Sequence, residues 1–70
     1  MQKVTNEYYV LVTYIGNDAL YVTEDYSVDT DIHKALRAKN MIAAQFLKNN
    51  IEIRHKCLFD IVPIKVTYEW

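Results

Sequence analysis

The feature that most constrains the fold is an apolar run at residues 8–15, which ends at Gly16, the only glycine in the chain. All of its residues except Leu11 are β-branched or aromatic, which favours a strand, and the lack of clean alternation indicates a central strand. Gly16 and Asn17 both accept the positive φ that a tight hairpin turn requires. We therefore expect residues 19–23 to form a second strand, antiparallel to the first.

The following segment, residues 24–31, is acidic and rich in turn-forming residues, which predicts a loop. Its carboxylates lack the spacing and the central glycine of a calcium-binding EF-hand loop, so we expect it to be solvated rather than to bind metal. Thr30 or Asp31 then caps a helical turn at residues 32–34.

Residues 32–49 admit two interpretations. A single helix would carry Lys39 within its apolar stripe. Alternatively, a short turn is followed by an extended segment at 36–38, and Asn40 caps a compact helix over residues 41–48. We prefer the second, because it explains Asn40 and removes Lys39 from the apolar face. Both interpretations place the same two i,i+4 pairs against the core, with Phe46 as the anchor: Ile42 with Phe46, and Ala43 with Leu47.

The cleanest alternation in the chain lies at residues 51–57 and predicts a half-buried strand. One face carries the uncharged side chains and His55, and the other carries the charged ones: Ile51, Ile53, His55 and Cys57 against Glu52, Arg54 and Lys56. On this reading Cys57 is buried and unreactive. Residues 58–60 then turn the chain into a last strand at 61–68, where Pro63 indicates an edge position.

The order strand, strand, helix, strand, strand predicts one α+β domain over residues 1–70. It consists of a small antiparallel sheet of about four strands, with one helix packed on one face. Hydrophobic residues make up 51% of the chain and charged residues 24%, a composition that excludes intrinsic disorder. A chain this short buries only about 60% of the surface that its unfolded form exposes, so the core is small.

The residues offer no recognisable catalytic or cofactor site, and we expect neither enzymatic activity nor a bound cofactor. His33, His55 and Cys57 are soft-metal donors, but their spacing is not that of a zinc site. A Cys–His nucleophile pair lacks an orienting third residue and a glycine-rich oxyanion loop. The single cysteine and the absence of an apolar N-terminal segment predict a cytoplasmic protein without a membrane segment.

Three features of the sequence bear on binding to a macromolecule. The outward face of the predicted sheet combines tyrosines with Arg and Lys. The C-terminal segment ends in aromatic residues, which either contact a partner or fold back on the core. Residues 1–31 also hold six acids and one base, whereas residues 32–70 hold seven bases and three acids. This segregation marks an interaction surface unless folding interleaves the two halves. The candidate partner-binding residues are Tyr9, Tyr21, Asp25, Asp29, Arg54, Lys56, Lys65, Tyr68 and Trp70.

Four stretches carry a resemblance to known proteins: residues 9–16, residues 20–22, Asp-Ile-His-Lys-Ala-Leu at 31–36 and Ala-Ala-Gln-Phe-Leu at 43–47. In this arrangement of a hairpin, a D-x-x-K-A segment, an A-x-x-F helix and closing strands, the chain resembles small uncharacterised accessory proteins of temperate phages of Gram-positive bacteria. The resemblance implies a phage-encoded protein that acts in the host cytoplasm. Some such proteins inhibit host enzymes or defence systems, anti-CRISPR proteins among them, but the pattern assigns no functional residue.

We therefore expect a non-enzymatic protein-binding module that inhibits a host or defence protein. The alternative is a small nucleic-acid-binding module that uses the Tyr/Arg/Lys sheet face. It is less favoured, because a net charge of −1 provides little neutralisation of phosphates. A homodimer through the C-terminal strand or the outer sheet face is also expected, although Pro63 and Lys65 are residues that keep a strand edge single.

Overall fold

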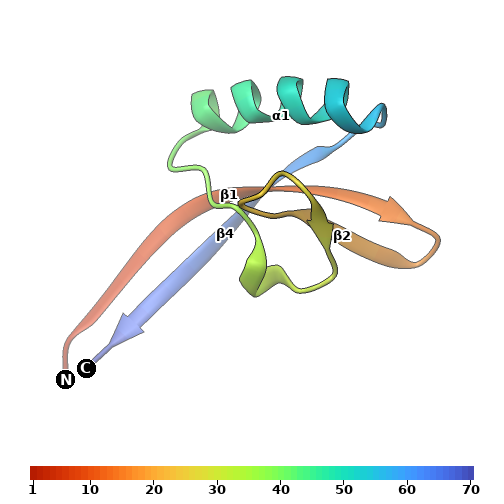
Figure 1. The fold of residues 1–70 in the computed structure, drawn as a ribbon. Helices are drawn as coiled ribbons and strands as arrows, with labels where there is room; N and C mark the ends of the chain where they lie inside the picture. The colour runs from red at the N-terminus through yellow and green to blue at the C-terminus, as the bar shows by residue number, and fades with distance from the viewer.

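The structure, a computed structural model, describes residues 1–70 and has an α+β fold with a four-stranded antiparallel sheet and one α-helix (Figure 1). The elements in chain order are β1 (Lys3–Ile15), β2 (Asp18–Val22), β3 (Val28–Asp29), the 3-10 helix η1 (Ile32–Lys34), α1 (Met41–His55) and β4 (Asp60–Glu69). The strand order in the sheet is β3-β2-β1-β4. The fold class is confirmed, and β1 is central as predicted, but the helix is preceded by three strands and followed by one.

The β1–β2 hairpin forms where the sequence predicts it. Ile15 pairs with Asp18, so the loop consists of Gly16 and Asn17. Gly16 has φ +62° and Asn17 does not have positive φ. Gly at the first of two loop positions is the arrangement of a type II′ turn, whose twist matches that of the flanking strands.

The preferred interpretation of residues 32–49 is confirmed up to the start of the helix. Asp31 caps η1 by accepting a hydrogen bond from the His33 N–H. The chain then runs extended, and the Ala38 N–H donates to the Tyr9 carbonyl at 2.8 Å. The Asn40 side chain accepts from the Ala43 N–H at 2.8 Å, which makes Asn40 the N-cap of α1.

The predicted strand at residues 51–57 is wrong, because α1 continues to His55. Ile51 follows Leu47 by four residues on the face that packs against the sheet, and its side chain is only 1% exposed. Lys48 and Glu52 form an i,i+4 ion pair at 3.1 Å. The helix ends at His55, and Lys56 is its C-cap, with a left-handed φ of 56°. Tertiary packing thus outweighs the period-2 pattern of this segment.

Two small apolar clusters lie on opposite faces of the sheet. On one face α1 packs Ile51 against Leu11, Val22 and Phe59, with partly buried Val28, Leu47 and Ile61 around them. On the other face Ala35, which follows η1, covers Val10 and Val12, with Ala19, Tyr21, Val62 and Ile64 at the margin. Val62 and Ile64 therefore lie on the side of the sheet opposite α1.

The predictions that Phe46, the residues Ile42 and Ala43, and Cys57 lie in the core are wrong. Because α1 is longer than predicted, it turns Ala44 and Ile51 toward the sheet and leaves Phe46 74% exposed. Ile42 and Ala43 are exposed as well, and Phe59, at 2% exposure, is the buried phenylalanine. Cys57 follows the helix and is an exposed free cysteine.

One end of the sheet consists of only two strands. β4 pairs with β1 from Lys3–Glu69 to Val12–Asp60, whereas β2 pairs only with residues 12–15 of β1. Residues 3–8 and 64–69 therefore project as a two-stranded arm that ends with the N- and C-termini side by side (Figure 1). The longest dimension of the molecule is 45 Å. β4 is an edge strand, as Pro63 predicts.

Candidate protein-interaction surface

The helix α1 is apolar on two opposite sides. Ala44 and Ile51 face the sheet and are buried. Helical geometry places Ile42, Phe46 and Ile53 within about 40° of one another, on the side that faces away from the sheet. Their exposed fractions are 84%, 74% and 77%. A helix that is apolar on both sides is typical of one buried on both sides, whereas here one side is open to solvent. We call Ile42, Phe46 and Ile53 the α1 apolar surface.

Two grooves lie beside the α1 apolar surface, and Phe46 and Leu47 line both of them. The first groove lies between α1 and the extended segment that precedes it, and its other lining residues are Leu36, Arg37, Ala38, Asn40, Ile42 and Ala43. The second lies between α1 and the loop after β2, and its other lining residues are Tyr26, Asn50, Ile51, Ile53 and Arg54. The exposed Phe46 ring therefore separates two hollows that can receive apolar side chains of a partner.

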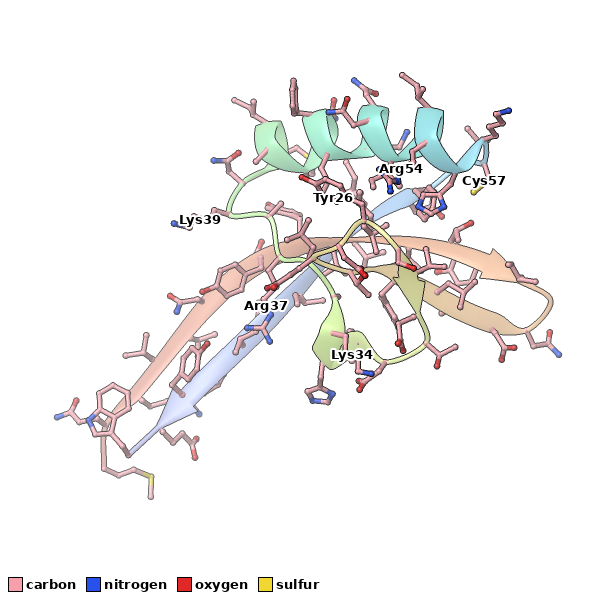
Figure 2. All side chains as sticks on the ribbon, viewed as in Figure 1. Tyr26, Lys34, Arg37, Lys39, Arg54 and Cys57 are labelled. Atoms are coloured by element: carbon pink, nitrogen blue, oxygen red, sulfur yellow. The ribbon has the colours of Figure 1, made fainter.

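The charged residues that line the two grooves, Arg37 and Arg54, are both cations. Lys39 lies near the start of α1 and Arg54 in its last turn, while Arg37 lies on the extended segment before α1 (Figure 2). None of the three forms an ion pair, although the Arg37 guanidinium lies 5.7 Å from the centre of the Tyr8 ring. The charge of Arg54 is the smallest of the effects that lower the pKa of Asp25. The rim of the α1 apolar surface is thus positive and unpaired.

The inner side of α1 is fixed by polar contacts as well as by packing. The Glu52 carboxylate accepts a hydrogen bond from the Phe59 N–H at 2.8 Å and pairs with Lys48. The Phe59 N–H, followed by Lys48, lowers the pKa of Glu52. His55 Nε2 donates to the Tyr26 carbonyl at 2.7 Å, and its ring meets Phe59 edge-on. These contacts hold the helix in place and leave its outer side without any intramolecular partner.

The predicted partner-binding residues do not form one surface. Tyr9 and Tyr21 are half-buried on opposite faces of the sheet, since Tyr21 packs with Val12. Arg54 and Lys56 belong to α1 and its C-cap rather than to a strand. The remaining predicted residues lie in the acidic loop and β3 or on the arm: Asp25 and Asp29, and Lys65, Tyr68 and Trp70. The Tyr/Arg/Lys sheet face on which the nucleic-acid alternative rested is not assembled.

The acidic loop is organised by its own hydrogen bonds. The Thr23 hydroxyl and the Ser27 N–H lower the pKa of Asp25, and the His33 N–H lowers that of Asp31. Asp29 pairs with Lys34 at 3.6 Å. The hollow beside this loop is lined mainly by polar residues, and the Asp25 and Asp29 carboxylates in its lining already have partners within the chain. It therefore offers little to an apolar ligand.

The candidate metal donors are distributed over the fold. His33 lies in η1, His55 ends α1, and Cys57 is exposed beyond the helix. No group of three or more His, Cys, Asp or Glu side chains has the geometry to hold a metal ion. No helix of the structure is long and apolar enough to cross a membrane.

Sequence reasoning missed the α1 apolar surface because it placed Ile42 and Phe46 in the core. The signal is present, however, once the helix is extended to His55. Ala44, Leu47 and Ile51 fall on one side, and a second apolar set falls on the other. Comparison with protein-family models, curated proteins and solved structures finds no match to this chain.

Proposed function

We propose that this chain is a non-enzymatic protein-binding module that holds an apolar segment of another protein on the α1 apolar surface. The observation that carries the proposal is the exposure of Ile42, Phe46 and Ile53 on one side of a helix. Only nine of the 70 residues are buried, so three large exposed side chains are a substantial share of the apolar material. Such contiguous apolar patches mark interaction sites in small proteins.

The shape and charge of the surface favour an amphipathic helix with acidic flanks as the occupant. Ile42 and Ile53 are about 16 Å apart along the helix axis, a length that three turns of a partner helix match. The grooves on either side of Phe46 suit apolar side chains at i, i+3 or i+4, and i+7 of a bound helix. Arg37, Lys39 and Arg54 attract carboxylates at its ends.

A second copy of the chain fits this surface less well. Antiparallel self-packing of α1 would bring Lys39 of one copy against Arg54 and Lys56 of the other, where like charges repel. Parallel packing would align each cation with itself. The α1 apolar surface is therefore better suited to a different protein.

The role of a phage-encoded inhibitor of a host or defence protein is the more specific form of this proposal. Its support is the sequence resemblance to phage accessory proteins. A module of this size inhibits by covering a surface of its target that the target needs for another contact, which requires no catalytic residue.

The test uses two synthetic amphipathic helical peptides that share the same leucine positions and differ only in their flanks, glutamate in one and lysine in the other. We expect the glutamate peptide to bind more tightly and to shift the amide NMR signals of α1. Phe46→Ala should abolish binding while the fold is retained. The matched control is Tyr14→Ala, because Tyr14 is an aromatic residue of 60% exposure at the hairpin end of β1, away from α1. Absence of binding, or binding that survives Phe46→Ala, would refute the proposal.

A further inference from the structure

The outer edge of β4 presents unpaired backbone groups on the arm. In an antiparallel ladder, residues alternate between hydrogen-bonded and non-hydrogen-bonded pairs. Gln2 and Trp70 exchange both of their N–H···O bonds, which makes them a hydrogen-bonded pair. Along β4, the residues at even positions therefore bond to β1, and the backbone groups of Lys65, Thr67 and Glu69 point outward.

Pro63 supports this assignment independently. It lies opposite Tyr9 at a position where the ladder requires no N–H from β4. Its own outward-facing position offers a carbonyl but no donor. An added strand can thus pair with the edge from Ile64 onward, and Pro63 ends the ladder there.

The edge is self-complementary in one two-fold register. Centring an antiparallel pair of β4 strands on Thr67 places Lys65 of each copy opposite Glu69 of the other. Within one copy, Glu69 pairs with Lys3 at 3.7 Å and Lys65 lies opposite Glu7. On this face of the dimer, charged side chains therefore form a row across the four strands, in the order Lys3 and Glu69 of one copy, then Lys65 and Glu7 of the second copy. Charges alternate in sign along the whole row, and cross-strand pairs of opposite charge stabilise a sheet.

Other registers of the same edge are poorer. Centring on Lys65 or on Glu69 puts like charges directly opposite each other. Centring on Val66 brings Pro63 opposite Glu69, where a donor is missing. Centring on Tyr68 leaves Lys65 outside the paired segment. The Thr67 register alone joins both ion pairs with a ladder that contains no proline.

The opposite face of the arm is apolar and becomes covered in this register. Tyr68 and Trp70 are 47% and 68% exposed, and they share a face with the half-buried Val66 and Ile64. In the Thr67 register, Tyr68 lies opposite Val66 of the second copy, and Trp70 lies opposite Ile64. Aromatic residues paired with β-branched residues are among the favourable cross-strand neighbours.

The other free edge of the arm, on β1, lacks this match. Its outward backbone groups belong to Lys3, Thr5 and Glu7, and the next outward residue, Tyr9, is already bonded to Ala38. Self-pairing centred on Thr5 also opposes Lys3 to Glu7, but on the other face it sets Val4 against Asn6. We propose that two copies of this chain associate through the outer edges of β4, in antiparallel register about Thr67. The result is a continuous sheet with the strand order β1-β4-β4-β1 at its centre.

The first experiment measures the molar mass by light scattering over micromolar to millimolar concentrations, for the full chain and for Thr67→Pro. The unmodified chain should shift from 8.3 kDa toward twice that mass. Thr67→Pro should remain monomeric, because proline removes the central outward N–H without removing a backbone hydrogen bond to β1. It also removes the hydrogen bond between the Thr5 and Thr67 hydroxyls, a loss that Thr5→Pro shares. Thr5→Pro, its counterpart on β1, should still dimerise. A strictly monomeric chain, or a dimer that survives Thr67→Pro, would overturn the proposal.

A charge-exchange experiment keeps the proposal testable if Thr67→Pro does not fold. Lys65→Glu and Glu69→Lys should each weaken self-association by about tenfold or more, because each places like charges opposite each other in both rows. Mixing the two variants restores opposite charges at both positions where residues 65 and 69 meet across the interface, so the mixture should form heterodimers. Two variants that stay monomeric when mixed, or single variants that dimerise as well as the parent chain, would contradict the register. Neither result bears on peptide binding by the α1 apolar surface.

Discussion

Phe59→Ala and Phe46→Ala remove the same atoms from very different surroundings. Phe59 is 2% exposed and packs with Leu11, Val22 and Ile51, so its truncation should cost about 3–5 kcal/mol. Phe46 is 74% exposed, and only about a quarter of its surface is in contact, so its truncation should cost less than about 1 kcal/mol. At about 0.05–0.15 kcal/mol per residue, the whole domain has a free energy of unfolding of only about 4–10 kcal/mol.

Thermal unfolding followed by circular dichroism distinguishes these two sites. In a domain of this size, each kcal/mol lowers Tm by about 4–8 °C. Phe59→Ala should lower Tm by at least about 12 °C or prevent folding, whereas Phe46→Ala should lower it by less than about 8 °C. Equal losses, or a larger loss for Phe46→Ala, would mean that α1 turns its other side to the sheet, and the α1 apolar surface would not exist.

Three further predictions test local features of the structure. Cys57 should react with a thiol reagent in native buffer at nearly the rate of the unfolded chain, because it is exposed; strong protection would contradict its position beyond α1. Asn40→Ala should lower the free energy of unfolding by about 1 kcal/mol, since it removes the N-cap acceptor, and a denaturant titration measures the loss. The lowered pKa of Glu52 means that its carboxylate stabilises the fold above the ordinary pKa of a glutamate, and that this contribution disappears as pH falls through the folded-state value. Glu52→Gln should therefore destabilise the protein at neutral pH and flatten the loss of stability on acidification, as measured by unfolding at several pH values.

The parts of the fold that local chemistry determines could be predicted from the sequence. The turn at Gly16 requires positive φ, which few other residues supply. Asp31 and Asn40 cap the helical segments that follow them because their side chains accept hydrogen bonds from backbone N–H groups two or three residues further on. Pro63 places β4 at an edge through its missing donor. In each case the interaction lies within a few residues of chain.

The part that could not be predicted depends on contacts between distant residues. Residues 51–57 alternate in polarity, and the pattern alone favours a strand over a helix. Ile51 is helical because Leu11, Val22 and Phe59 surround it, and those contacts span up to forty residues of sequence. The same misassignment of residues 51–57 accompanies the wrong predictions that Phe46 and Cys57 lie in the core. The position of the candidate site was lost by the same step, because the exposed side of α1 is visible only when the full length of the helix is known.

The two proposed surfaces are independent and can be occupied together. The α1 apolar surface faces away from the sheet, whereas the proposed dimer uses the arm, which extends beyond the region that α1 covers (Figure 1). A dimer through β4 would therefore leave two α1 apolar surfaces free. Two linked surfaces raise the effective affinity for a target that displays its acidic helix twice, as a symmetric target does. Self-association through the arm would thus strengthen partner binding without any new contact at α1.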